Sequence, residues 1–151
     1  SVRSLTLIAP AGLGRVADLR PLQELARAAT SEEIESLLSR LVADPRRLPR
    51  GFAEAAAKLR SDAGMRQAQA ELLGTLFADG APRFDTAAML GRVGCPISIV
   101  WGRQDRILDA SQALAAPATA SLHLLPGVGH MPHVERPALV ARLLAAATDQ
   151  R

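Results

Sequence analysis

Three short apolar runs, separated by stretches with helical patterns, constrain the fold of this sequence most strongly. They cover residues 5–9, 97–101 and 121–125, and each is followed at once by proline or glycine. Short unbroken apolar runs are typical of strands that are buried on both faces, as in parallel sheets. Strands that alternate with helices favour an α/β fold with a parallel sheet.

The long stretch between the first two runs has helical rather than strand periodicity. Thr30 and Glu33 form a capping-box pattern, which predicts a helix that continues until Asp44-Pro45. Further helices are expected over about 51–60, 62–78 and 137–148, with a turn at 79–82. We therefore divide the chain into a sheet-bearing core (1–14 and 92–151) and a helical insertion (15–91).

Composition excludes several classes of protein. The single cysteine, Cys95, rules out an internal disulfide and a cysteine-based metal site, and we interpret it as a small packing residue. The net charge is +3, but the arginines are scattered among acidic residues and there are only four aromatic side chains, which argues against nucleic-acid binding. No apolar run could span a bilayer and no signal peptide is visible, so the expected location is the cytoplasm, without membrane contact.

Two polar side chains follow the second and third predicted strands. Asp105 comes after Val100-Trp101-Gly102, and His130 follows the glycine-rich turn Pro126-Gly127-Val128-Gly129. Sites in open α/β sheets form beyond the carboxyl ends of the strands. We therefore expect Asp105 and His130 to lie within hydrogen-bonding distance of each other.

These segments resemble a known superfamily. Gly-x-x-Asp after one strand and Pro-Gly-x-Gly-His-x-x-x-x-Glu-x-Pro after the next are similar to the acid and histidine segments of α/β hydrolases. Residues 8–14 and 101–107 most resemble the hydrolase-like acyltransferase component of acetoin dehydrogenase complexes, and also carbon–carbon-bond hydrolases. The resemblance implies the C-terminal half of that fold: its last three parallel strands, with a helical cap inserted after the first.

The resemblance also implies catalytic roles. His130 would act as general base and acid, and Asp105 would accept the other ring N–H and orient the imidazole. The alternatives are a loop histidine bonded to backbone and an aspartate that caps a helix. Asp109 is a rival acid, although a helix-capping role suits it better.

Other residues near the motif receive plainer interpretations. We interpret His123 and His133 as structural, and Glu135 as a turn or cap residue near His130. Met131 either lines a pocket or packs in the core.

The nucleophile of the family is missing from this sequence. No serine stands in a Gly-x-Ser-x-Gly elbow, so the adjoining oxyanion-hole donors are missing too. Gly12-Leu13-Gly14 lacks the rest of a dinucleotide fingerprint and is expected to give the backbone freedom where the chain leaves the sheet. The chain alone is therefore expected to be inactive, and to bind no metal or cofactor.

These observations lead to a functional hypothesis with open alternatives. The intact protein is expected to transfer acyl groups, with a lipoyl group as possible carrier. A carboxylesterase or carbon–carbon-bond hydrolase is the near alternative, and a non-catalytic binding or assembly module the distant one. Expected partners are a small ester, thioester or ketone substrate, and a missing N-terminal half or second copy at the exposed edge of the first strand.

Overall fold

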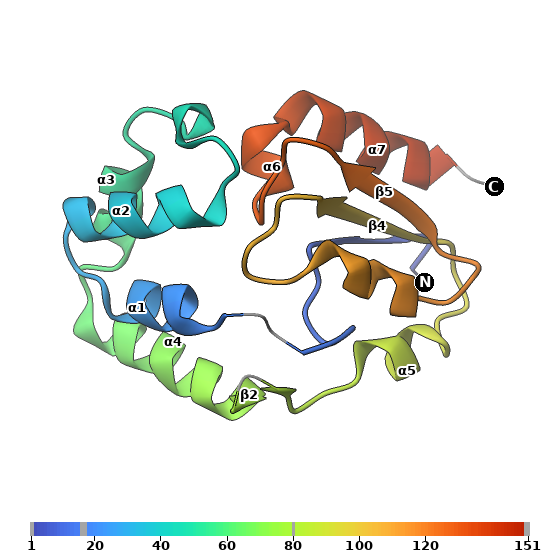
Figure 1. Ribbon diagram of the computed structural model, residues 1–151, viewed down its shortest axis with the longest axis horizontal. Coiled ribbons are helices and arrows are strands. Elements are labelled where there is room, and N and C mark those ends of the chain that lie inside the picture. The colour runs from blue at the N-terminus through green and yellow to red at the C-terminus, as the bar shows by residue number, and fades with distance from the viewer. Residues whose placement is uncertain (1, 16–17, 80, 150–151) are drawn as a thin grey trace.

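A computed structural model describes residues 2–15, 18–79 and 81–149 of the chain. Its main sheet contains β1 (Leu5–Ile8), β4 (Ile97–Gly102) and β5 (Ser121–Leu125), in the order β1-β4-β5 and parallel throughout. The three strands match the three apolar runs, so the predicted partial α/β-hydrolase fold is confirmed. Figure 1 shows the sheet at one end of the molecule and a group of helices at the other.

Burial of both faces, which the sequence predicts for all three strands, holds only for the central one. All six residues of β4 are buried, whereas every residue of β1 is half-buried and β5 alternates between exposed and covered positions. The prediction is wrong for β1 and β5 because each has a neighbouring strand on one side only among the described residues.

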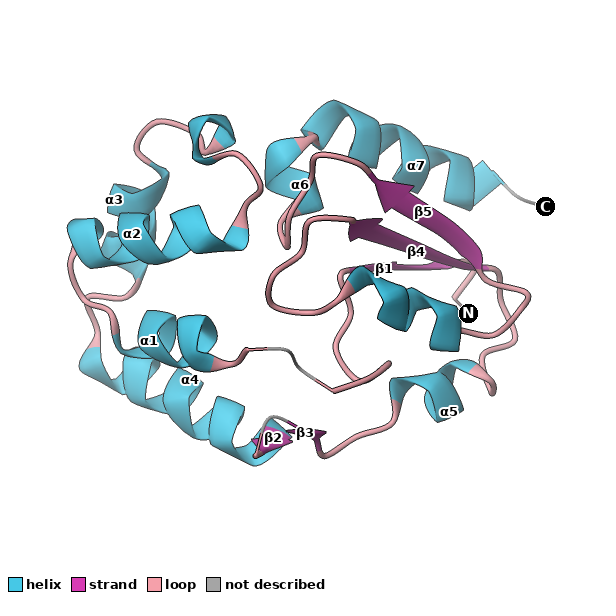
Figure 2. Cartoon of the chain, in the orientation of Figure 1, coloured by secondary structure: helices cyan, strands magenta, loops and turns pink. Residues whose placement is uncertain are grey.

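The helical segment that follows β1 contains α1 (Arg20–Arg27), α2 (Ser31–Leu41), the 3₁₀ turn η1 (Pro45–Arg47), α3 (Phe52–Leu59) and α4 (Ala63–Leu76). These elements gather on the left of Figure 2, away from the strands. The predicted capping box is present: the Thr30 side chain accepts a hydrogen bond from the Glu33 N–H, and the Glu33 carboxylate accepts one from the Thr30 N–H. This reciprocal bonding explains why α2 starts at Ser31.

The end of α4 differs from the prediction. The helix stops at Leu76, because Phe77–Ala78 (β2) pairs with Ala81–Pro82 (β3) as a two-residue antiparallel hairpin. Gly80, within the predicted turn, lies outside the described residues. Helices α1 and α5 (Thr86–Leu90) were not expected from the sequence.

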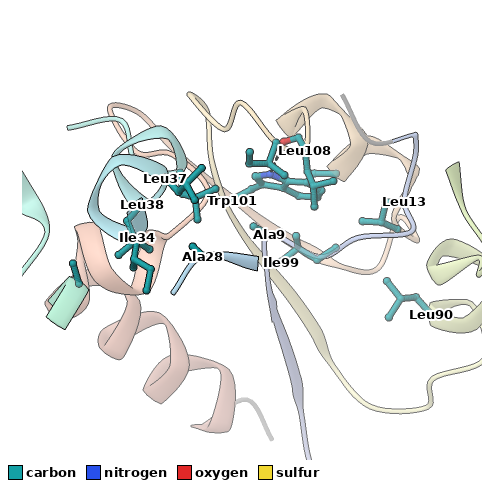
Figure 3. Close-up of a cluster of buried hydrophobic side chains, with 14 of the residues drawn as sticks. Ala9, Leu13, Ala28, Ile34, Leu37, Leu38, Leu90, Ile99, Trp101 and Leu108 are labelled. Carbon is teal, nitrogen blue, oxygen red and sulfur yellow. Dashed lines mark hydrogen bonds between the residues drawn. The ribbon is translucent and has the colours of Figure 1, made fainter. Parts of the chain in front are cut away.

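Two apolar clusters cover the two faces of the sheet. The larger joins α2 to the face of β4 that carries Ile99 and Trp101, and Figure 3 shows Leu37 of α2 near Trp101. The smaller packs Val100 and Val128 against Val140 of α7 (Pro137–Asp149), which covers the opposite face. The sheet is thus anchored to the helical segment on one side and to α7 on the other.

Short elements connect these layers. The 3₁₀ helix η2 (Ala110–Ala115) lies between β4 and β5, and α6 (Pro132–Glu135) precedes α7. Where the chain leaves β1, Gly12 has a φ of +87°, so the predicted backbone freedom is used there.

In the part of the chain that the structure describes, no helix is long and apolar enough to cross a membrane. The division into a sheet-bearing core (1–14 and 92–151) and a helical insertion (15–91) stays a prediction. Six residues of these two units, 1, 16, 17, 80, 150 and 151, lie outside the described ranges.

Candidate functional site

Asp105 lies in a tight turn at the carboxyl end of β4. Its N–H donates to the Gly102 carbonyl at 3.2 Å, which turns the chain back immediately after the strand. The carboxylate is completely shielded from solvent. A buried carboxylate is costly unless several donors surround it, so its hydrogen bonds determine whether it is stable there.

Four donors surround the Asp105 carboxylate. The N–H groups of Ile107 and Leu108 donate to Oδ1 at 2.8 and 3.0 Å. The Trp101 indole N–H donates to Oδ2 at 2.9 Å, and His130 Nδ1 lies 2.8 Å from the same oxygen. Because three N–H groups already point at this carboxylate, it acts as an acceptor toward His130, and the imidazole proton belongs on Nδ1.

His130 projects from the loop between β5 and α6. The Gln104 side-chain oxygen accepts hydrogen bonds from the N–H groups of Gly127 (2.6 Å) and Val128 (3.2 Å), and so ties this loop to the turn after β4. The His130 N–H donates to the carbonyl of Leu41 in α2 at 2.7 Å. The imidazole is 20% exposed, which leaves it accessible beside a shielded carboxylate.

The pairing that the sequence predicts between Asp105 and His130 is therefore present in the structure. Asp109, the rival acid, instead accepts from the Ser111 N–H at 2.8 Å and caps η2. Hydrogen bonds from Ser111 hold the pKa of Asp109 below its ordinary value. The helix-capping interpretation of Asp109 is correct, and it does not hold the imidazole.

The remaining histidines and Cys95 stay outside this arrangement. Partial burial, followed by the nearby charge of His130, lowers the pKa of His133. His123 is half-buried on β5, and Cys95 is a half-buried free thiol. Met131 is half-buried and packs against the larger apolar cluster, which supports the packing interpretation.

Sequence reasoning missed three side chains that build this site. Trp101 was treated only as part of a strand, although its indole N–H holds Asp105. Gln104 and Arg47 bond the backbone of the histidine loop. The position of Gln104 within Gly-x-x-Asp was an available signal, whereas Arg47 is 80 residues from its partner Gly127 and carries no local signal.

A cavity of about 390 Å³ lies between α2, η1 and the start of α3. Its lining includes Leu38, Leu48 and Phe52 but neither Asp105 nor His130. Among the described residues, no group of three or more histidine, cysteine or acidic side chains is arranged to hold a metal ion. The chemistry suggested by the site therefore rests on the pair Asp105 and His130.

A family comparison agrees with this geometry: the model of the "Alpha/beta hydrolase family" matches residues 1–143. The chain belongs to this family. It is similar to the dihydrolipoyllysine-residue acetyltransferase component of an acetoin cleaving system from Pseudomonas putida, with 34% identity over 89% of this chain and 35% of that protein. It is also 34% identical to a monoacylglycerol lipase of Bos taurus, over 41% of this chain and 19% of the lipase.

Solved structures show the same fold. The 2-hydroxy-6-oxo-6-phenylhexa-2,4-dienoate hydrolase of Rhodococcus sp. strain RHA1 superposes with a TM-score of 0.73 and 22% identity, covering 96% of this chain and 54% of the hydrolase. The chain thus spans about a third of the Pseudomonas relative and about half of the Rhodococcus enzyme.

Proposed function

We propose that this chain supplies the acid and the histidine of a serine-type catalytic triad, as the C-terminal portion of an acyl-transfer enzyme. One observation carries the proposal: His130 Nδ1 lies 2.8 Å from a buried carboxylate, on Asp105, that three other N–H groups hold in place. An oriented imidazole of this kind needs only a nucleophile on its other nitrogen to complete the triad geometry.

In this proposal His130 exchanges protons through Nε2. With Nδ1–H donated to Asp105, Nε2 is free to take the proton of an attacking hydroxyl and return it to the leaving group. Asp105 stabilises the positive charge that the imidazole acquires. The nucleophile and the oxyanion donors belong to a segment outside these 151 residues, since this sequence has no Gly-x-Ser-x-Gly elbow.

We propose that the nucleophile-bearing segment pairs with the free edge of β1. Among the described residues, β1 pairs only with β4, and the edge that faces away from β4 bears unpaired backbone groups. Such an edge attracts another strand. The occupant is either the preceding part of the same protein or a separate chain with that part of the fold.

For the substrate, we propose an acetyl group carried on a lipoyl thiol. The likeness to the Pseudomonas acetyltransferase component supports this assignment, because it extends over 89% of the chain. The acyl group would move from the thiol to the serine and then to an acceptor. A hydrolase that transfers the acyl group to water is the second candidate, and the local likeness to the monoacylglycerol lipase favours it.

The experiment measures acyl transfer to two acceptors, water and a thiol, with the longest available protein that contains this chain as the enzyme. Hydrolysis of p-nitrophenyl acetate reports transfer to water, and acetylation of dihydrolipoamide by acetyl donors reports transfer to a thiol. Asp105→Asn and His130→Ala should each reduce either activity by about 10³-fold or more. Faster transfer to the thiol supports the acyltransferase and faster hydrolysis the second candidate, whereas unchanged rates in both variants refute the triad.

The 151-residue chain without further segments should hydrolyse p-nitrophenyl acetate no faster than free histidine does. It has the base but neither the nucleophile nor the oxyanion donors, which together supply most of the rate. Saturable turnover that disappears in His130→Ala would show that this chain contains a nucleophile of its own.

A further inference from the structure

Glu135 is a buried acid that the proposed mechanism does not use. Its side chain has no solvent exposure, and each of its oxygens accepts a backbone hydrogen bond. Oε1 accepts from the N–H of Gly129, next to His130, at 2.6 Å. Oε2 accepts from the N–H of Ala43, just after α2, at 2.9 Å. One carboxylate therefore bridges the histidine loop and the helical segment, which is more than the turn or cap role expected from the sequence.

Two further contacts join the same two parts of the chain. The His130 N–H donates to the Leu41 carbonyl at 2.7 Å, and the Arg47 guanidinium donates to the Gly127 carbonyl at 2.6 Å. Arg47 also lies 3.9 Å from Glu135 Oε2, so its positive charge lies beside the buried carboxylate. Residues 41–47 thus hold the histidine loop directly at Gly127 and His130, and through Glu135 at Gly129.

The fit between these segments leaves no spare room. A Cβ atom on Gly129 would lie 2.7–2.8 Å from backbone atoms of Leu41, Val42 and Ala43, closer than side chains normally approach. The loop also contains two glycines, which on their own would make its backbone flexible. Contacts from residues 41–47 are therefore what restricts this loop on the side away from β4.

We propose that Glu135 and Arg47 are positioning residues for His130, and that through them the helical segment sets the placement of the imidazole against Asp105. Only the effect of this placement on catalysis depends on the proposed function; the placement itself does not. An imidazole displaced by about 1 Å loses much of its catalytic power, so a motion of residues 41–47 would change the activity without touching the reacting atoms.

Proton NMR of the 151-residue chain tests this directly. Asp105 Oδ2 receives two N–H groups, one from His130 Nδ1 and one from Trp101 Nε1, and each gives a separate exchangeable signal. Arg47→Ala and Glu135→Gln should accelerate solvent exchange of the His130 proton by about tenfold, the factor carried by one hydrogen bond of ordinary strength. The Trp101 proton should keep its exchange rate, because its anchors lie within β4 and the following turn.

Arg46→Ala is the matched control. Arg46 is the neighbouring arginine and is itself exposed, and its guanidinium bonds only the half-buried Asp44 among the described residues. This variant should leave both protons unchanged. If Glu135→Gln fails to fold, Arg47→Ala still decides the question.

Two outcomes would overturn the proposal. Equal acceleration of the His130 and Trp101 protons would show a general loss of structure instead of a positioning effect. Unchanged exchange of the His130 proton in Arg47→Ala would show that the helical segment does not position it. Neither readout depends on activity, so a failure of the proposed function, seen with His130→Ala in the acyl-transfer assay, is distinguishable from a failure here.

Discussion

Gly102→Ala adds a single methyl group, yet it should lower the free energy of unfolding substantially. Gly102 ends β4 directly beneath the histidine loop. A Cβ there would lie 2.1 Å from the Gly129 carbonyl oxygen and 2.3 Å from that of Val128, whereas ordinary van der Waals contact begins at 3.4 Å. The loop would have to retreat by about 1 Å, but Gly129 already lies so close to the backbone of residues 41–43 that not even a Cβ atom would fit there.

The expected cost has two parts. Overpacking costs about 1–3 kcal/mol. A 1 Å retreat also breaks the 2.9 Å hydrogen bond from the Gln104 N–H to the Val128 carbonyl, and a polar group left unpaired costs about 1–3 kcal/mol. The total is about 2–6 kcal/mol, a large part of the roughly 5–15 kcal/mol that stabilises a typical domain.

Urea denaturation measures this loss, with the fluorescence of the single, fully buried Trp101 as the signal. Gly74→Ala is the matched control, because Gly74 lies inside α4 and, apart from its chain neighbours and the backbone of its own helix, no described atom lies within 4 Å of the added methyl group. That change should stabilise the chain by up to about 1 kcal/mol through helix propensity. A Gly102→Ala protein that unfolds within about 0.5 kcal/mol of the original would refute the tight packing on which the argument depends.

Three further predictions concern other parts of the chain. Trp101→Phe removes the indole donor to Asp105 and should cost about 1–3 kcal/mol in urea unfolding followed by circular dichroism; an unchanged midpoint would contradict its role. The N–H groups of Leu5 and Ala9 point toward β4, so the N–H group of Thr6 points toward the free edge of β1. Thr6→Pro removes this donor and should reduce self-association or partner binding, as measured by light scattering. Unchanged association would argue against pairing at this edge. Hydrogen bonds from the backbone N–H groups of Ala29 and Thr30 lower the pKa of Glu33. The stability that the Glu33 carboxylate contributes is therefore complete above about pH 5 and is lost as the pH falls through the lowered pKa. Glu33→Gln should remove this contribution from the pH dependence of acid unfolding, and an unchanged pH dependence would contradict the prediction.

The strands and the acid–histidine pair could be predicted because their signals are local. Each strand is an apolar run that ends at proline or glycine, and Asp105 and His130 each follow a strand within a few residues. Because sites in parallel α/β sheets gather at the carboxyl ends of strands, the two side chains could be expected to meet.

The parts that the sequence could not predict depend on distant neighbours. The hairpin of β2 and β3 overrides a helical pattern by pairing two residues on each side. The half-exposure of β1 and β5 depends on what lies beside them, which their own residues do not encode. The sequence indicates only a turn or cap role for Glu135, and the approach of Ala43, 92 positions earlier, makes it a bridge.

The separation along the chain between bonded groups has a consequence for folding. The backbone and indole bonds to Asp105 join residues at most four positions apart, so they can form as soon as the turn after β4 closes. The bonds from residues 43 and 47 to Glu135 and to the histidine loop join residues 80 to 92 positions apart and must wait for the helical segment to dock. During refolding, we therefore expect the hydrogen bonds around Asp105 to form before the imidazole reaches its final placement.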